Sequence, residues 1–560
     1  MSKNFFENQS HSILIIFLIL AGYFFLMFGN GVMSLTHPDE VFYVQSAKEM
    51  VQHNSWLTPL IFDWPQFEKP IFFYWLLAGV IKIFGPTPFA ARFWPAFFGI
   101  LGVLASYSIA WTLFRKKRAA FLSGIILMTS WIYLALSRAV LTDMVFSIWV
   151  AIALGFFCWG YYERRYRERG IILFFVFTGT AILTKGFLGF LFCLTPVFAF
   201  LIYKKDFVFL KTKSLLLGIF LLALIALPWH VLMYRWYGQE FFAEYWQNVH
   251  VRRIFAAEHP KNDTWYFYLM IMFAGMMPWS LFLIPTAGMI YKFFSLSAEN
   301  RDRFAFLLFW ITAVYVFVQP AHSKLASYIF PVFPAMAVLL AFYFEKILES
   351  GTKRIFNKSV EIVGYLMAVI LTGLGIAAII MAQKYSSFVP GMVPVYIFTS
   401  VAIGLAAVLA VTAFKRHCGM QIAVNASITC LILVVMLISR PYVEPWVSCK
   451  DISIVLNAQD RSTTTLLTSK FYARGVRFYT DRKVAVININ GKGFFSPHPI
   501  PFLNTDEKVL NFLKEQPVTY GIVRKADLSD LRRITSGVYQ IHKLEAIGGK
   551  QLIRIEKMSY

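Results

Sequence analysis

The hydrophobic positions of this chain gather into long runs, separated by short polar stretches, over roughly its first 440 residues. A helix needs roughly 20 mostly apolar residues to cross a bilayer. Thirteen spans are predicted on that basis: 12–33, 89–113, 119–137, 142–161, 170–184, 187–203, 214–233, 266–291, 304–319, 325–344, 360–382, 393–414 and 420–439. The pattern therefore predicts a polytopic α-helical membrane protein. Its first span is interpreted as a retained helix, since it exceeds a usual signal-peptide core and lacks a small-residue cleavage pattern.

The last 120 residues or so have a different pattern, with short apolar runs and frequent turns. Strands are predicted at "TTTLLTSK", "VRFYT", "KVAVININ", "VTYGIVRK" and "KQLIRIEK", with turns at 490–491 and 548–549. "TDEKVLNFLKEQ" predicts a helix with Thr505 as its N-cap. We therefore expect two domains, a membrane domain over residues 1–440 and a small α/β domain over 441–560.

The charge pattern predicts how the spans are oriented. The chain is 58% hydrophobic and carries a formal net charge of +23. Alternate loops are basic throughout, and the intervening short connections carry about one basic residue each. Positively charged loops stay in the cytoplasm, so 34–88, 234–265 and the C-terminal domain are expected outside. The positive charge thus reflects topology and contact with anionic lipid, and no nucleic-acid partner is predicted.

Metal and disulfide chemistry has weak sequence signals. The five cysteines are scattered and form no CxxC motif, so neither a disulfide framework nor a thiolate metal site is predicted. Glu68, His250 and His259 could supply oxygen and nitrogen ligands to Zn²⁺ or Mg²⁺, but they lack HExxH-type spacing. Solvated histidines are the alternative interpretation, and no cofactor is certain.

The stretch "THPDEVFYVQSAKEMV", residues 36–51, places Asp39 and Glu40 just after the first span. Its apolar residues recur at helical spacing, which predicts an amphipathic helix along the membrane surface. Two interpretations stay open. Thr36 and Asp39 fit a capping box, or Asp39 takes part in chemistry.

Further polar residues lie at the same predicted membrane–water boundary. They are Lys69 in "FEKP", Arg138 and Asp143 beside one span, Lys185 between two short spans, Arg253 in the 234–265 loop, and His322 and Lys324 before another span. Each has a structural alternative, such as an interfacial lysine or an Arg138–Asp143 pair marking a turn. Intramembrane or boundary carboxylates are functional candidates by default, and cations beside them suit a lipid phosphate as substrate.

The same stretches resemble a known family. The matching pieces are "HPDEVFYVQSAKEM", "FEKPIFFYW", "LTKGFLG", "LPWH", "HVRRIF", "WYFYLMIMFAGMMPW" and "SKLASYIFPVFPAMA". In order and spacing they resemble the lipid A 4-amino-4-deoxy-L-arabinose transferases, which are relatives of the dolichyl-phosphate-mannose protein mannosyltransferases. The resemblance covers the chain to about residue 345.

This resemblance implies a GT-C glycosyltransferase fold in the bacterial inner membrane, with a periplasmic active site. It implies an inverting transfer of a sugar from undecaprenyl phosphate to lipid A. Asp39 and Asp143 would be active-site carboxylates, Lys69 and Arg253 would bind the donor phosphate, and Glu68 would belong to a metal-containing site. Lys185 is a weaker phosphate ligand, and Glu40, Arg138, His322 and Lys324 are weaker substrate-binding candidates.

The chain departs from the family pattern in its first loop. Where "RYAEISREM" is expected after "PDE", the chain has "VFYVQSAKEM", so Phe42 replaces an arginine and Gln45 replaces a glutamate. This loosens the assignment of sugar and acceptor. Two alternatives are a protein O-glycosyltransferase using a polyprenyl-phosphate sugar and a transporter. The second is disfavoured because we find no internal repeat and the polar residues gather at one face.

Overall fold

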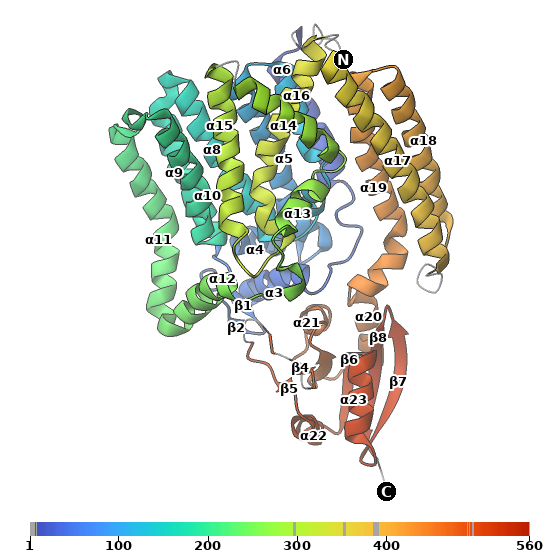
Figure 1. Cartoon of the computed structure of the whole chain (residues 1–560). Coiled ribbons are helices and arrows are strands. Elements are labelled where there is room, and N and C mark those ends of the chain that lie inside the picture. The colour runs from blue at the N-terminus through green and yellow to red at the C-terminus, as the bar shows by residue number, and fades with distance from the viewer. Residues whose placement is uncertain are drawn as a thin grey trace. The chain divides into compact units, whose positions relative to one another are not determined.

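The chain divides into two compact units, which are described in turn (Figure 1). The computed structural model describes residues 6, 8–294, 298–350, 354–384, 391–489, 491, 493–494 and 498–558. Unit 1 comprises Met1–Asn30 and Arg92–Ile438, and unit 2 comprises Gly31–Ala91 and Ser439–Tyr560. The sequence interpretation assigned 34–88 to the membrane domain, whereas the structure groups this segment with the C-terminal residues.

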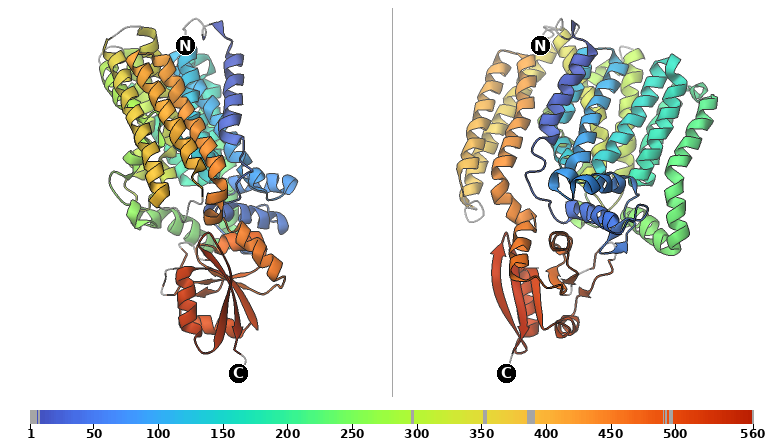
Figure 2. Two further views of the ribbon diagram at one scale, coloured as in Figure 1. Left: turned by 90° about the vertical axis from the view of Figure 1, so that its right-hand side faces the viewer. Right: turned by 180° about the vertical axis from the view of Figure 1, so that it is seen from behind.

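Unit 1 is built from helices that lie side by side (Figures 1 and 2). They are α2 (His11–Gly22), η1 (Tyr23–Met27), α5 (Pro88–Phe114), α6 (Lys117–Met128), α7 (Trp131–Ser137), α8 (Thr142–Tyr162), α9 (Arg167–Lys185), α10 (Phe187–Lys204), α11 (Lys213–Phe241), η4 (Phe242–Arg252), α12 (Arg253–Phe255), α13 (Phe267–Gly275), η6 (Ser280–Phe282), α14 (Leu283–Phe294), α15 (Ala298–Val318), η7 (Ala326–Val332), α16 (Phe333–Ser350), α17 (Arg354–Lys384), α18 (Val393–Phe414) and α19 (Cys418–Val447). Short 3₁₀ turns connect some of them: η2 (Arg164–Tyr166), η3 (Phe207–Leu210) and η5 (Pro260–Asn262).

Each of the thirteen predicted spans contains helix. Within the described residues, eight helices are long and apolar enough to cross a membrane, or up to ten if each bent pair counts as one span. The two bent pairs are α6 with α7, at 66°, and α13 with the η6–α14 segment, at 112°. The chain is therefore a multi-pass membrane protein, and the number thirteen stays a prediction.

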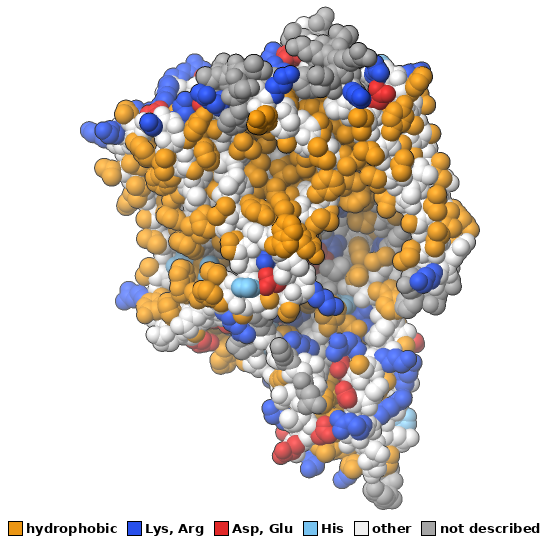
Figure 3. Space-filling model, in the orientation of Figure 1, with side chains coloured by type: hydrophobic (Ala, Val, Ile, Leu, Met, Phe, Trp, Pro, Cys, Tyr) orange, Lys and Arg blue, Asp and Glu red, His pale blue; other side chains and the backbone are white. Residues whose placement is uncertain are grey.

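The surface of unit 1 fits a lipid environment. Hydrophobic side chains cover its helices as a broad band, and Lys and Arg gather along one edge of that band (Figure 3). Several of these cations bind acidic residues on other helices or connections. Arg118 donates to Glu345 at 2.8 Å in a buried pair, and Arg164 donates to Asp206 at 2.6 Å. The basic loops predicted to set topology therefore also hold helix ends together.

Unit 2 combines the first loop with a C-terminal sheet. The first loop forms α3 (Asp39–Gln52), a two-stranded hairpin of β1 (Leu60–Ile61) and β2 (Trp64–Pro65), and α4 (Phe72–Phe84). The C-terminal elements are α20 (Lys450–Gln459), β3 (Leu466–Ser469), α21 (Ala473–Thr480), β4 (Val484–Ile487), β5 (Phe502–Leu503), α22 (Asp506–Lys514), β6 (Val518–Arg524), α23 (Lys525–Thr535), β7 (Tyr539–Ile547) and β8 (Lys550–Lys557).

The six-stranded sheet has the order β5-β4-β3-β6-β8-β7 (Figure 2). Pairing is parallel from β5 to β6 and antiparallel among β6, β8 and β7. Apolar residues of the sheet and of helices α22 and α23 form one core, in which Leu467, Val523 and Ile553 are fully buried. Local hydrophobic pattern is enough to form these strands, because each buries a face against a helix.

Most predicted elements of this region are confirmed, including four of the five strands, the Thr505-capped helix and the Gly548-Gly549 turn. The strand predicted at "VRFYT" is wrong, since these residues end helix α21. Asn490, half of the other predicted turn, lies outside the described residues.

Candidate functional site

Lys185 lies at the tip of a helical hairpin formed by α9 and α10. The turn is a single residue, Gly186, with φ of +81°, which L side chains rarely adopt. A Cβ at this position would also lie 2.8 Å from Nε2 of His250 and would collide with the Tyr245 hydroxyl. The glycine of the "LTKG" motif is thus required both for its backbone conformation and because a Cβ would have no space. The turn at Gly186 determines where the Lys185 side chain projects.

Asp143 and Lys185 form a buried ion pair. The Lys185 ammonium lies 2.5 Å from Oδ1 of Asp143, with both side chains under 10% exposed. Asp143 is in the first turn of α8 and Lys185 in the last turn of α9, the ends where the helix dipoles favour these charges. Asp143 thus pairs with Lys185, a partner that the interpretation of an Arg138–Asp143 pair did not include.

The pair leads through an aromatic ring to a second cation. Lys185 lies over the Tyr328 ring, 4.7 Å from its centre, and Arg253 donates from Nη1 to the Tyr328 hydroxyl at 3.0 Å. Arg253 also lies 3.3 Å from Glu258. We call Asp143, Lys185, Tyr328, Arg253 and Glu258 the unit 1 group. The structure brings together three residues predicted separately, and adds Tyr328, which lies within the quoted "SKLASYIF" motif.

Arg138 has a structural position. Its two terminal nitrogens donate to the carbonyls of Phe25 and Phe28, at 3.1 and 2.8 Å, where the first helix ends. The last carbonyls of a helix lack partners within it. Arg138 therefore supplies hydrogen bonds that the end of the first span needs.

His322 and Lys324 converge on one carboxylate. Both lie 2.6 Å from Asp263, through His322 Nδ1 and the Lys324 ammonium. Their hydrogen bonds hold the pKa of Asp263 below its usual range. The same segment contacts the unit 1 group, because the Ser323 amide donates to the Arg253 carbonyl at 3.0 Å. His322 and Lys324 thus form one polar cluster with Asp263.

The predicted metal ligands are divided between the two units. No group of three or more His, Cys, Asp or Glu side chains that could hold a metal ion occurs among the residues that the structure describes. His250 uses Nδ1 on the Tyr245 carbonyl, at 2.7 Å, and its ring stacks on Trp246. Glu68 belongs to unit 2, and His250 and His259 to unit 1. The metal site thus stays a prediction.

In unit 2, helix α3 begins at Asp39. The predicted capping box of Thr36 with Asp39 is wrong by one residue. Glu40 is the acid that reaches back, and it accepts from both the Thr36 amide and the Thr36 hydroxyl at 2.9 Å. Glu40 thus makes the hydrogen bonds that the predicted capping box assigned to Asp39.

The "FEKP" motif is held against α3. The Glu68 amide donates to the Gln66 side chain at 3.1 Å, and Gln66 donates to Ser46 of α3 at 3.3 Å. Lys69 is buried and donates to the Glu68 carbonyl at 3.0 Å. We call Asp39, Glu68 and Lys69 the unit 2 group.

The two departures from the family pattern have partners in unit 2. Phe42 lies under the guanidinium of Arg474, 4.4 Å from ring centre to Cζ. Gln45 donates to Glu49 at 2.6 Å, and burial raises the pKa of Glu49. Sequence reasoning missed Arg474 altogether, because it lies about 430 residues after α3 and in no quoted motif.

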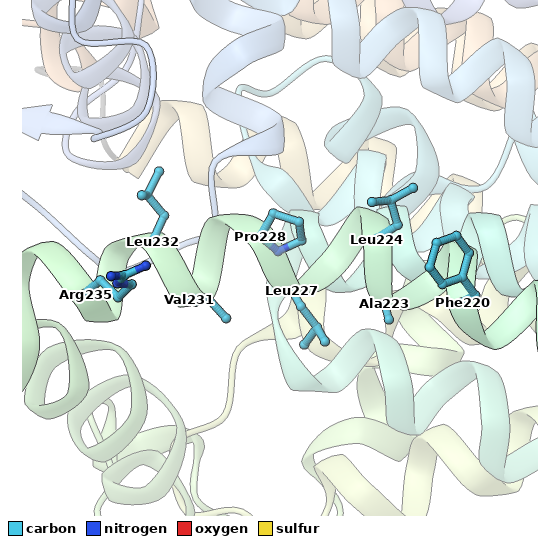
Figure 4. A pocket seen from close by; sticks show the side chains of 8 residues that line it. All are labelled: Phe220, Ala223, Leu224, Leu227, Pro228, Val231, Leu232 and Arg235. Carbon is cyan, nitrogen blue, oxygen red and sulfur yellow. The ribbon is translucent and has the colours of Figure 1, made fainter.

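An apolar groove runs along α11, lined by Phe220, Ala223, Leu224, Leu227, Pro228, Val231, Leu232 and Arg235 (Figure 4). All eight residues come from one helix. The groove holds none of the candidate residues, and its apolar lining suits contact with lipid chains.

Comparisons with known proteins agree with the resemblance. Residues 12–246 match the family model described as dolichyl-phosphate-mannose-protein mannosyltransferase. An uncharacterized protein of Aquifex aeolicus is 28% identical over 59% of this chain and 63% of its own length. The undecaprenyl phosphate-alpha-4-amino-4-deoxy-L-arabinose arabinosyl transferase 2 of Proteus mirabilis is 28% identical over 58% of this chain and 59% of its own length. The chain thus spans about three fifths of the length of these relatives.

The fold extends the similarity to nearly the whole chain. The crystal structure of ArnT from Cupriavidus metallidurans bound to undecaprenyl phosphate has a TM-score of 0.79 and 18% identity, covering 97% of this chain and 98% of that one. The apo structure of the same protein gives 0.78. The predicted polytopic GT-C architecture and the family resemblance are therefore confirmed.

Proposed function

We propose that this protein is an inverting glycosyltransferase. It moves 4-amino-4-deoxy-L-arabinose, or a similar sugar, from undecaprenyl phosphate to lipid A or another envelope glycan. The reaction takes place at the periplasmic face of the bacterial inner membrane.

The unit 1 group is the main structural support for this proposal. Arg253 is held by the Tyr328 hydroxyl, and Tyr328 lies beside the buried Asp143–Lys185 pair. A guanidinium fixed in this way suits a lipid phosphate, since arginine matches phosphate oxygens with two parallel N–H groups. The relatives named as undecaprenyl phosphate-dependent arabinosyl transferases support the same donor.

In the proposed reaction the acceptor oxygen bonds to the anomeric carbon while the bond from that carbon to the phosphate oxygen breaks. The electron pair leaves with undecaprenyl phosphate, so negative charge grows on its oxygens. Preplaced cations stabilise such a transition state. Arg253 is assigned this role from its contacts in the unit 1 group, and Lys69 is assigned it only because "FEKP" resembles the family motif. Lys185, paired with Asp143, is assigned the positioning of Tyr328 and thereby of Arg253.

The role of Asp39 depends on the acceptor. A hydroxyl acceptor must lose its proton, and Asp39 would accept it as general base. A phosphate acceptor is already ionised at neutral pH, and Asp39 would then orient the reactants.

Mass spectrometry of the cell envelope tests the proposal. Deletion of the gene should remove one sugar modification from lipid A, and expression of the full chain should restore it. Unchanged lipid A together with a lost modification on envelope proteins would favour protein O-glycosylation instead. The family model matched by residues 12–246 is the observation that favours this second candidate.

A further inference from the structure

Helix α21 of the C-terminal segment packs alongside α3 within unit 2. Arg474 contacts Phe42, Arg477 contacts Glu49, and Lys48 contacts Asp481 at 2.5 Å. Arg474 and Arg477 are three residues apart and therefore share one face of α21, and Asp481 is the residue directly after that helix.

Arg477 makes a saturated structural contact. Its Nη2 donates to both carboxylate oxygens of Asp63, at 2.9 and 2.8 Å, and its Nε lies 3.5 Å from the buried Glu49. Such a bidentate pair fixes two segments relative to each other. Arg477 thus fastens α21 to α3 and to the turn after β1.

Arg474, one turn earlier, is held differently. Its Nη2 lies 3.1 Å from Nε2 of His498, and its guanidinium stacks on the Phe42 ring. Burial lowers the pKa of His498 to about 4, so this histidine is neutral and accepts the hydrogen bond. Within the described residues Arg474 Nε is buried and has no hydrogen-bond partner. Its charge is therefore fixed in place mainly by neutral groups.

This fixed charge faces the "FEKP" motif. Arg474 Nη2 lies 3.9 Å from Oε1 of Glu68, and both side chains are 16% exposed. Glu68 and Lys69 are adjacent in the chain, and the Lys69 ammonium donates to the carbonyl of Glu68. A shift of Glu68 would therefore shift the cation assigned to the donor phosphate.

We propose that Arg474 is a positioning residue of the donor site. Supplied by the C-terminal segment, it holds the Glu68 carboxylate and thereby sets the place of Lys69. The inference rests on the proposed function, since Lys69 is assigned there to the phosphate of a polyprenyl donor.

Binding of undecaprenyl phosphate to the purified full-length chain is the first test. Arg474→Ala should weaken binding about tenfold, and Arg474→Lys about threefold, because lysine keeps the charge but cannot stack and donate as a planar group. Arg533→Ala is the matched control, since Arg533 pairs with Asp506 on the exposed surface of the same unit. It should stay within twofold of wild type. Binding by Arg474→Ala within twofold of wild type would overturn the proposal.

A double-mutant cycle separates positioning from direct contact. If Arg474 acts through Glu68, then Arg474→Ala should change binding less than twofold in a Glu68→Gln background. A persisting tenfold loss in that background would mean that Arg474 binds the phosphate itself, and would overturn the positioning role. Size-exclusion profiles check that each variant is folded. If Arg474→Ala is unfolded, the double-mutant cycle is measured with Arg474→Lys instead.

This test stands apart from the test of the proposed function. Undecaprenyl phosphate is a probe without a sugar or an acceptor, so binding is measurable whichever sugar is transferred. Failure of the lipid A experiment with an intact Arg474–Glu68 coupling would revise the acceptor. If the Arg474–Glu68 coupling is absent while the lipid A modification is intact, only the positioning role of Arg474 is refuted, and the proposed function stands.

Discussion

At the scale of single residues, the buried Asp143–Lys185 pair is expected to affect stability as well as activity. Both groups are buried, so neither charge is solvated by bulk water. Removing one partner of a buried pair leaves the other charge uncompensated, which typically costs about 3–5 kcal/mol.

We therefore expect Asp143→Asn to lower the stability of the purified protein by about that amount, about 3–5 kcal/mol. Thermal unfolding in detergent measures this effect. The double variant Asp143→Leu, Lys185→Met removes both charges and should recover most of the melting temperature without recovering sugar transfer. Recovery of transfer in the double variant would show that the pair has no part in the reaction.

Asp39 and Glu40 are neighbours with separable roles. Glu40→Gln weakens the contacts with Thr36 and should cost about 1 kcal/mol while retaining transfer. Asp39→Asn should keep the fold and lower transfer to a hydroxyl acceptor about 100-fold or more, the usual scale of general-base catalysis. Assays of both variants at equal folded concentration decide this. Equal activity losses in the two would contradict the division of roles.

Sequence reasoning found these residues but not their partners. Asp143, Lys185 and Arg253 stand out because charges beside apolar runs are rare. That Lys185 would pair with Asp143 depends on α9 packing against α8, which no local pattern states. Arg138 was a candidate for the same reason, and only the fold shows it bonded to Phe25 and Phe28.

At the scale of elements, the α9–α10 hairpin depends on Gly186. Gly186→Ala combines a left-handed backbone with a Cβ pressed against His250 and Tyr245. We expect a loss of about 1–3 kcal/mol and a displaced Lys185. Gly373→Ala is the matched control, because Gly373 lies in α17 with open space around it and helical alanine is favoured over glycine. Melting temperatures of the two variants measure the difference, and equal values would contradict the constraint.

Helix α21 shows where local pattern misleads. "VRFYT" is rich in β-branched and aromatic residues, which favour strands. These residues form a helix because one face of α21 packs on α3 while Val476 is buried against the sheet side of unit 2. Tertiary contacts override propensity here, and the helix that "VRFYT" belongs to also supplies Arg474.

The contact between Arg474 and His498 predicts a pH dependence of stability. The pKa of His498 is about 4 in the folded protein and is near 6.5 when unfolded. Between these values the unfolded chain binds more protons, so stability falls as the pH falls through that window.

Between pH 7 and pH 5, His498 should account for about 2 kcal/mol of lost stability. His498→Gln keeps an acceptor for Arg474 but cannot titrate. The variant should therefore lose less melting temperature than wild type over the same pH range. Parallel pH profiles of the two proteins would contradict this origin.

At the scale of the whole molecule, the helices were predictable and the grouping of segments was not. The position of a membrane helix depends on the local composition of the chain, and each predicted span contains helix. The union of 31–91 with 439–560 depends on pairs such as Arg477 with Glu49, which are 428 residues apart in the chain. No periodicity reports such pairs.

The basic loops also predict how the chain is oriented in the membrane. Cations bound to acids, such as Arg164 to Asp206, hold one edge of unit 1 together, and the positive-inside rule places that edge in the cytoplasm.

A cysteine introduced at exposed Arg165 should react with a membrane-impermeant maleimide only after cell lysis. A cysteine at exposed Ser536, in the C-terminal segment, should react in intact cells with a permeabilised outer membrane. The parent chain is the control, since four of its five cysteines are buried. The reverse labelling pattern would place the C-terminal segment in the cytoplasm, where a lipid A acceptor on the periplasmic face is out of reach, and would end both the orientation and the proposed reaction.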